Sequence, residues 1–345
     1  MKTIRWGIIG CGDVTEVKSG PGFQKSTGSS LVAVMRRDGA KAADYARRHG
    51  VPRWYDDADA LIADADVDAV YIATPPDVHE LYAMRVCAAG KPCYVEKPVS
   101  RNVPEAQRMV KAFADRKLPL FVAYYRRGQP RFVKAREIIQ SGVLGAIHTV
   151  SYRFNDDGMR RRQEPVPWRL AAETAGGGLF LDIGSHALDL LDWMAGPLTE
   201  VRGRAENRGG QYDLEDHVEL EFKTTLGSHG TAVWSLIEPE RFDEYLFAGD
   251  RGELRFSCFG KDPVRISRPG GGVVESFDIP YPPHVGQPLI QLMVDELRGA
   301  VGACPSTGVS ALRTQQVMDI ALEGFYGGRE DGFWKRPRAS GAMRT

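Results

Sequence analysis

The first 123 residues alternate short apolar runs with amphipathic stretches. The apolar runs are rich in β-branched or aromatic residues, as strands covered on both faces are; they read IRWGIIG, SLVAVM, DAVYIAT, KPCYVE and PLFVAY. Amphipathic stretches such as DGAKAADYARRHG end in a glycine suited to the left-handed position after a helix. This alternation predicts a doubly wound parallel sheet over residues 1–123.

After residue 123 helical patterns give way to a long series of alternating strands. Short glycine-rich turns such as TTLGS and GDRGE join several of these strands and indicate hairpins. We expect a second, α+β domain over residues 124–335 with a large open, mainly antiparallel sheet and helices on one face. Two helical stretches, PLIQLMVDELRGAV and GVSALRTQQVMDIALEGFY, complete it, and residues 336–345 form a tail.

Composition narrows the function classes. The 345 residues are 43% hydrophobic, and 45 basic residues balance 45 acidic ones. A formal net charge of zero gives no global attraction to nucleic acid or to an anionic membrane. No signal-like start or apolar run of about 20 residues is present. Five cysteines without zinc-site spacing fit a reducing compartment. A cytoplasmic protein is therefore expected.

The segment GIIGCGDVT marks a nucleotide site. Gly10 and Gly12 follow the first strand, where a tight turn lets backbone N–H groups approach a pyrophosphate at a helix start. Thr15 replaces the third glycine of the usual pattern, so the prediction depends on the strand–turn–helix context. The same turn adds three candidate cofactor contacts: Cys11, Asp13 and Val14. A small side chain suffices to explain Cys11, and a reactive thiol is the alternative.

Two neighbouring segments bear on the cofactor. Gly20-Pro21-Gly22 should interrupt the first helix, either as a surface kink or as a lid over the cofactor. Arg36 and Arg37 end the second strand, where a carboxylate would hold a ribose 2′-hydroxyl but a guanidinium binds a 2′-phosphate. The arginines therefore favour NADP over NAD, the alternative being a solvated basic turn. Asp38 should cap a helix that begins near Ala40.

The next candidates follow two later strands of the same sheet. In ATPPDVHE, Thr74 and Pro75 end a strand because a proline cannot continue the hydrogen-bond ladder. In YVEKPVS, Glu96 and Lys97 stand between an apolar strand and a proline, which favours a functional lysine. Both strand ends lie at the carboxyl edge, where open α/β sheets bind ligands. His79 should stabilise a helix start beside the cofactor.

The segment GGGLFLDIGSHALDLLDWMAG predicts a helix with two distinct faces. A rotation of about 100° per residue places Asp182, His186, Asp189 and Trp193 in one narrow stripe. Core packing explains a separate apolar stripe made of Phe180, Ile183, Ala187, Leu190, Leu191 and Met194. It does not explain the polar stripe. A metal site is the competing interpretation, but no third ligand is evident, so no metal is expected.

Taken together, these motifs resemble the glucose–fructose oxidoreductase and inositol dehydrogenase (Gfo/Idh/MocA) family. The resemblance spans nearly the whole chain: the glycine turn, TPPDVH, EKP, WR before a triple glycine, and GGG-x-x-x-D-x-G-x-H. It implies an N-terminal Rossmann domain, a C-terminal domain with an open antiparallel sheet, and a homodimer or homotetramer built through that sheet.

The resemblance also implies roles for single residues. Lys97 becomes the catalytic lysine, and Asp182 and His186 hold the reacting sugar or polyol hydroxyl. His186 suits proton exchange, and Lys97 stabilises a developing alkoxide; which of the two moves the proton stays open. Trp168 and Arg169 resemble a pair that NADP-dependent sugar reductases of the family, 1,5-anhydrofructose reductase among them, place near the cofactor. The alternative is a packed tryptophan beside a surface arginine.

The sequence gives weaker indications of substrate specificity. Tyr124 and Arg126 are candidate substrate contacts, but Tyr125 replaces an asparagine common in relatives, which weakens any transfer of specificity. Residues 155–167 form either a specificity loop or a solvated connection. His284 is a weaker candidate for the cleft. The other histidines outside the motifs are taken as structural: His49, His148, His217 and His229.

The resulting hypothesis is an NADP-dependent oxidoreductase. It transfers a hydride between nicotinamide and a carbohydrate-type carbonyl or hydroxyl, in a sugar, anhydrosugar or polyol. One alternative is a glycosidase of the same fold that uses bound NAD for transient oxidation. Another is a non-catalytic nucleotide-sensing protein, because a fold does not establish activity.

Overall fold

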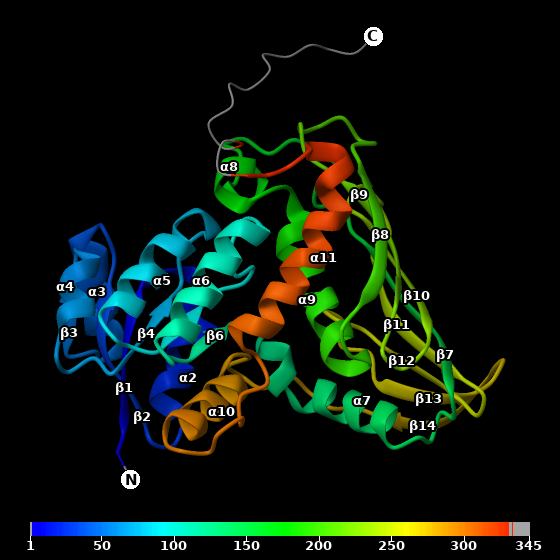
Figure 1. Ribbon diagram of the computed structural model, residues 1–345, viewed down its shortest axis with the longest axis horizontal. Coiled ribbons are helices and arrows are strands. Elements are labelled where there is room, and N and C mark those ends of the chain that lie inside the picture. Colours follow the sequence, from blue (N-terminus) through cyan, green and yellow to red (C-terminus); the bar gives the residue numbers. More distant parts are fainter. Residues whose placement is uncertain (1, 331–332, 334–345) are drawn as a thin grey trace.

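A computed structural model describes residues 2–330 and 333 and contains two sheets (Figure 1). The first has six parallel strands in the order β3-β2-β1-β4-β5-β6. The strands are β1 (Ile4–Ile9), β2 (Ser29–Met35), β3 (Arg53–Tyr55), β4 (Ala69–Ile72), β5 (Cys93–Val95) and β6 (Leu120–Val122). The doubly wound sheet is confirmed. The sequence pattern missed β3, because three partly exposed residues leave too short a run to detect.

Helices cover both faces of this sheet, which explains its continuous apolar strands. Ile8, Val70 and Val122 are fully buried. The helical elements are α1 (Asp13–Val17), α2 (Gly20–Lys25), α3 (Gly39–His49), α4 (Ala58–Ala63), η1 (Pro76–Val78), α5 (His79–Ala88) and α6 (Val103–Asp115). The carboxyl ends of β1, β4 and β5 share one edge and direct the glycine turn, Thr74 and Lys97 toward the second half of the chain.

The second sheet has eight strands in the order β14-β13-β12-β11-β7-β10-β9-β8. Its strands are β7 (Ile147–Asn155), β8 (Thr199–Glu206), β9 (His217–Lys223), β10 (His229–Ser235), β11 (Phe242–Gly249), β12 (Glu253–Phe256), β13 (Val264–Arg268) and β14 (Gly271–Phe277). The sheet is antiparallel except where β7 pairs with β10. The mainly antiparallel prediction is therefore confirmed.

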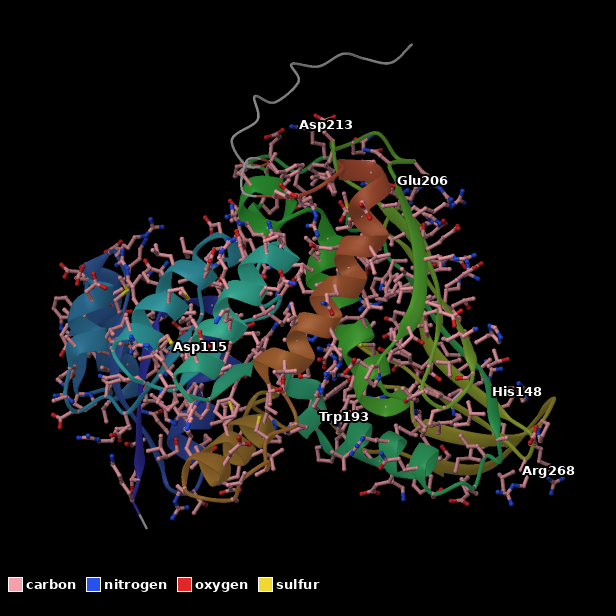
Figure 2. All side chains as sticks on the ribbon, viewed as in Figure 1. Asp115, His148, Trp193, Glu206, Asp213 and Arg268 are labelled. Atoms are coloured by element: carbon pink, nitrogen blue, oxygen red, sulfur yellow. The ribbon has the colours of Figure 1, made fainter. Side chains whose placement is uncertain are left out.

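Helices pack on one face of this sheet and leave the other face open (Figure 1). Tyr152, Phe222 and Trp234 point inward into the core beneath the helices. Figure 2 shows polar side chains on the opposite side, among them Glu206. The helical elements of this half are η2 (Tyr125–Gly128), α7 (Pro130–Gln140), η3 (Trp168–Leu170), α8 (Ala172–Ala175), α9 (Leu179–Ala195) and α11 (Gly308–Tyr326).

One late helix returns to the first sheet. Helix α10 (Gln287–Leu297) buries Leu289 and Met293 in the same core cluster as Trp6 and Phe23. It belongs structurally with the parallel sheet, although the sequence pattern grouped it with the second domain. An amphipathic pattern shows that a helix packs but not on which sheet.

Helix α10 also explains the Gly-Pro-Gly segment. The first helix does end early, at Val17, and α2 then begins at Gly20. A Cβ on Gly22 would lie 2.8 Å from Ile290 Cδ1, so the backbone of α2 packs directly against α10. The segment is therefore a buried packing surface. The expectations of a surface kink or a lid were both wrong.

Candidate active site

A pocket of about 350 Å³ lies where the carboxyl edge of the parallel sheet meets α9. Both halves of the chain contribute to its wall. Twelve of the sequence candidates line it: Gly12, Asp13, Val14, Thr74, Pro75, Glu96, Lys97, Arg126, Trp168 and Arg169, together with Asp182 and His186 from α9. Residues distant in sequence thus meet at the edge where the fold predicts a ligand.

The glycine turn leaves room for a dinucleotide. Gly10 has φ +90°, and a Cβ there would lie 2.9 Å from Thr74 Cγ2, so the turn depends on glycine. A Cβ on Gly12 would meet just one atom, at 3.9 Å, which leaves open space above the backbone. Gly12 N donates to Thr15 Oγ1 at 3.0 Å. The replacement of the third glycine therefore closes the turn with a side chain, and these residues fit a pyrophosphate.

Cys11 is a packing residue within this turn. Its side chain is fully buried, and burial raises the pKa of the thiol to about 11. A thiol with such a pKa is almost wholly protonated near neutral pH and is a poor nucleophile. Burial and the raised pKa therefore favour packing as the role of Cys11 over a reactive thiol.

Arg36 lies beside the glycine turn. Its Nη1 donates to the carbonyl oxygen of Cys11 at 3.4 Å, whereas Arg37 is exposed. Asp38 caps α3 by accepting from Lys41 N at 3.2 Å, and the helix begins at Gly39, one residue before the expected start. Because Asp38 is engaged with α3, the guanidinium of Arg36 is the charged group at the end of β2 that faces the turn.

His79 and Glu96 make hydrogen bonds around the pocket wall. His79 lies behind the pocket wall, with Nε2 2.8 Å from Thr74 O and Nδ1 3.1 Å from Pro98 O. Burial lowers the pKa of His79 to about 4, and the neutral ring, which has a single N–H, donates to a carbonyl oxygen of one of the two loops. Glu96 lines the pocket and accepts a hydrogen bond from the hydroxyl of Tyr71. Burial raises the pKa of Glu96.

Lys97 reaches across the pocket to α9. Its Nζ donates to Asp182 O at 3.1 Å and to the Asp182 carboxylate. Arg169 Nε lies 3.3 Å from the other carboxylate oxygen. Burial alone would raise the pKa of Asp182, but Lys97 and Arg169 outweigh that effect and lower it. Asp182 is therefore a carboxylate held between two cations, and it fixes the position of the Lys97 ammonium.

His186 faces the same pocket one helical turn after Asp182. The residue is 5% exposed, and its Nδ1 is buried without a hydrogen-bond partner in the described part of the chain. Burial lowers the pKa of His186 well below 6.5, and the nearby charges of Arg126 and Lys97 lower it further. The imidazole is thus neutral near pH 7 and retains hydrogen-bonding capacity for a ligand.

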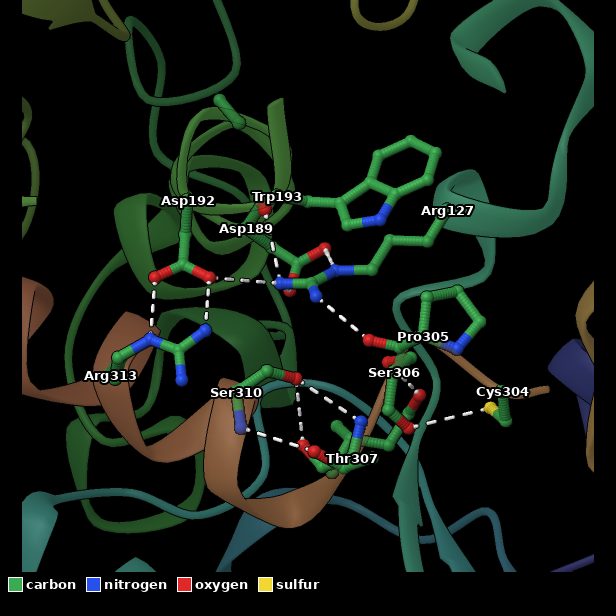
Figure 3. A network of polar contacts seen from close by, with 12 residues as sticks. Arg127, Asp189, Asp192, Trp193, Cys304, Pro305, Ser306, Thr307, Ser310 and Arg313 are labelled. Carbon is green, nitrogen blue, oxygen red and sulfur yellow. Dashed lines mark hydrogen bonds and ion pairs between the residues drawn. The ribbon is translucent and has the colours of Figure 1, made fainter. Parts of the chain in front are cut away.

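The predicted polar stripe of α9 divides into two parts. Asp189 lies away from the pocket, where Arg127 Nη2 approaches its carboxylate to 2.7 Å (Figure 3). Arg313 makes a second ion pair with Asp192, also at 2.7 Å. Trp193 packs under the guanidinium of Arg136, at 4.9 Å from the ring centre. Half of the stripe therefore serves the pocket, and half holds the second domain together.

The remaining candidates are placed as follows. Tyr124 is fully buried in the core and does not line the pocket, which corrects the expected substrate contact; Tyr125 lines it instead. No residue of 155–167 lines the pocket, which favours a connecting role for this segment. His284 contacts Val17 O at 2.8 Å outside the pocket.

Sequence patterns missed several lining residues, notably Lys18, Tyr125 and Phe259. Phe259 follows β12 and carries no motif, so no local signal marks it. Tyr125 directly precedes Arg126, a candidate substrate contact, and this position could have indicated that an aromatic side chain forms part of the pocket wall. Among the described residues, no group of three or more histidines, cysteines or acidic residues could hold a metal, and no helix is long and apolar enough to cross a membrane.

The parallel sheet with its glycine turn, and the lysine at its carboxyl edge facing an aspartate and a histidine of α9, fit a nicotinamide-dependent oxidoreductase. Family models agree: residues 4–124 match "Oxidoreductase family, NAD-binding Rossmann fold" and residues 132–255 match "GFO/IDH/MocA C-terminal domain". The chain belongs to the Gfo/Idh/MocA family and is an NAD(P)-dependent oxidoreductase.

Individual relatives extend along most of the chain. Oxidoreductase P35 of Formosa agariphila is 37% identical over 92% of this chain and 98% of its own length. Levoglucosan dehydrogenase of Pseudarthrobacter phenanthrenivorans is 31% identical over 66% of this chain and 64% of its own. A levoglucosan dehydrogenase structure in complex with NADH and levoglucosan superimposes with a TM-score of 0.80, at 21% identity, over 93% of this chain and 97% of the other. At that identity the superposition shows the shared fold.

Proposed function

We propose that the protein transfers a hydride between NADP and a carbohydrate-type hydroxyl or carbonyl, in a sugar, anhydrosugar or polyol. The observation that carries the proposal is the placement of Lys97, Asp182 and His186 in one pocket with the glycine turn. Relatives named for sugar substrates, levoglucosan dehydrogenase among them, support the substrate class. A 1,5-anhydrofructose reductase-like activity falls within it.

Lys97, Asp182 and His186 have different roles at the reacting oxygen. The nicotinamide ring supplies hydride chemistry when bound. Lys97 donates a hydrogen bond to the substrate oxygen and stabilises its negative charge as the hydroxyl is oxidised. Asp182 holds the lysine ammonium in place. His186 is neutral and accepts the hydroxyl proton in oxidation, returning it in reduction.

Arg36 supports a preference for NADP. A guanidinium beside the Cys11 carbonyl, at the end of β2, suits the 2′-phosphate of the adenosine ribose. Trp168 and Arg169 add to the pocket wall, with the guanidinium 4.4 Å from the indole centre. NADH in the levoglucosan dehydrogenase complex belongs to that protein, so the preference of this chain rests on its own Arg36.

Cofactor titration tests the first half of the proposal. Fluorescence quenching should give a lower Kd for NADPH than for NADH. Arg36→Asp should weaken NADPH binding by about tenfold or more, the loss of a charge-assisted contact, and leave NADH binding nearly unchanged. Arg116→Asp, distant from the pocket, is the matched control. Equal Kd values for both cofactors in the parent protein would refute the NADP preference.

Substrate screening tests the second half. Purified protein with NADP⁺ or NADPH should oxidise or reduce a member of a panel of sugars, polyols and ketoses. Release of an aglycone without added cofactor would instead favour the transient-oxidation glycosidase, and cofactor binding without turnover of any panel member would favour a sensor. The cytoplasmic location and the homodimer or homotetramer expected from the sequence stay predictions.

A further inference from the structure

Arg126 stands apart from the other buried arginines of the second half of the chain. Arg127 pairs with Asp189, and Arg329 with Asp319. Arg131 donates to Gly260 O and Asp262 O at 2.9 and 2.8 Å. Each of these guanidinium groups is therefore neutralised by a carboxylate or shared between carbonyl oxygens.

The guanidinium of Arg126 has fewer hydrogen-bond and ion-pair partners than these arginines. The residue is 6% exposed and forms one hydrogen bond, from Nε to Cys258 O at 3.1 Å. Its Nη1 is buried and has no partner in the described part of the chain, and no described carboxylate forms an ion pair with it. A buried, unpaired charge is costly to fold, so such a group is retained where a ligand supplies the missing partner.

The guanidinium of Arg126 belongs to the pocket wall. Its central carbon lies 4.5 Å from the ring centre of Phe259 and 5.1 Å from that of Tyr125. Both rings also contact the imidazole of His186, with centres 6.0 and 5.2 Å apart. The unpaired cation thus lies beside the group assigned to the reacting hydroxyl.

We propose that Arg126 binds a carboxylate of the substrate, so that the enzyme acts on a sugar acid rather than on a neutral sugar. This inference rests on the proposed function, which it narrows to one substrate class. A carboxylate carries one negative charge, which matches the single charge of a guanidinium that no described carboxylate neutralises. Two other cations of the pocket wall, Lys97 and Arg169, are engaged with Asp182, and Lys18 adds a further positive charge to the lining.

The proximity of the two groups has a chemical consequence. The charge of Arg126 disfavours protonation of His186 in the free enzyme. A bound carboxylate offsets that charge, which makes His186 a stronger base once an acidic substrate is in place. A neutral sugar leaves the imidazole a weak base. Arg126 therefore favours acidic over neutral sugars both in binding and in proton transfer to His186.

The test compares matched acidic and neutral sugars on the holoenzyme. Calorimetry on the NADP⁺-loaded protein measures binding of D-glucuronate against D-glucose, D-galacturonate against D-galactose, and D-gluconate against D-glucitol. We expect an acidic member to bind at least about tenfold more tightly than its neutral counterpart. Arg126→Met should abolish that preference, and Arg131→Met, a buried arginine outside the pocket, should preserve it.

The outcomes separate this inference from the proposed function. Turnover of neutral sugars as good as that of acids, or binding without preference for any acid, overturns the carboxylate assignment and leaves the oxidoreductase intact. Selective acid binding without hydride transfer supports Arg126 and overturns the proposed activity. Tighter binding of D-glucose 6-phosphate than of D-glucuronate overturns the carboxylate in favour of a phosphate. If Arg126→Met does not fold, the parent protein's preference decides.

Discussion

At the residue scale, Lys97 and His186 have separable roles although they share one pocket. Lys97→Met removes the cation near the substrate oxygen, and we expect kcat to fall by about 10²-fold or more while NADPH still binds. His186→Ala should have a loss of similar size. Stopped-flow hydride transfer and cofactor fluorescence measure the two effects. Lys111→Met, on an exposed helix surface, is the control; unchanged turnover in either pocket variant removes that residue from the mechanism.

The lowered pKa of His186 predicts that activity is retained at a lower pH than an ordinary histidine would allow. A histidine with the ordinary pKa of 6.5 would lose half of its neutral form at that pH. Because burial and Arg126 hold the pKa of His186 well below this value, kcat/KM for oxidation should stay level as the pH falls through 6.5 and decline only under more acidic conditions. Initial rates from pH 4.5 to 8 check this. A half-maximal rate at pH 6.5 would contradict the assigned neutral state.

The lowered pKa of His186 also affects how the free energy of unfolding depends on pH. Below pH 6.5 the unfolded chain protonates His186, whereas the folded chain does not until its lower pKa is reached. The unfolded state therefore binds more protons in this window, and the free energy of unfolding decreases as the pH falls. Stability and activity thus have different dependences on pH, although one side chain contributes to both.

At the element scale, the packing of α2 against its surroundings can be tested with glycines. A Cβ on Gly20 would meet Thr15 O and the hydroxyl of Tyr45, so Gly20→Ala should lower the free energy of unfolding by about 1–3 kcal/mol. Gly324 lies in α11 with open space around it. Gly324→Ala should instead stabilise the protein by about 0.5–1 kcal/mol. Urea denaturation compares them, and equal effects would contradict the buried assignment of α2.

Local patterns predicted most elements and the motif residues at the pocket, because both depend on residues close in sequence. Hydrophobic spacing identified α9, and the ends of β4 and β5 followed from prolines. What the patterns could not give depends on long-range packing. Helix α10 returns to the parallel sheet, Phe259 reaches the pocket from beyond β12, and the isolation of Arg126 is visible only when every neighbouring carboxylate is placed.

At the scale of the whole molecule, a buried ion-pair network joins η2, α9 and the segment before α11 (Figure 3). Arg127 donates to Asp189 and to Pro305 O. Arg127→Met leaves a buried carboxylate unpaired, and we expect a loss of about 3–5 kcal/mol in the free energy of unfolding. Arg127→Met combined with Asp189→Leu should lose clearly less, because no unpaired charge remains. Urea unfolding of the three proteins checks this, and equal losses would contradict the coupling.

We expect two copies of the protein to associate through the open face of the eight-stranded sheet. Ser151 of β7 pairs with Thr231 of β10 and with Leu246 of β11, which places three uncharged side chains side by side at the centre of the sheet. Ion pairs such as Arg204 with Glu219 lie toward one side. Arg153 of β7 and Glu244 of β11 lie two residues away on the same face and add charges beside this patch. An uncharged patch bordered by charged residues is a pattern found in protein interfaces.

Light scattering should therefore report a dimer or tetramer. Thr231→Arg combined with Leu246→Arg places like charges from both copies at the centre of the contact, and should shift the protein toward monomers with cofactor binding retained. Ile320→Arg, on the helical side of the molecule, should leave the assembly unchanged. A monomeric parent, or a double variant that assembles as the parent does, would show that this face does not join the subunits.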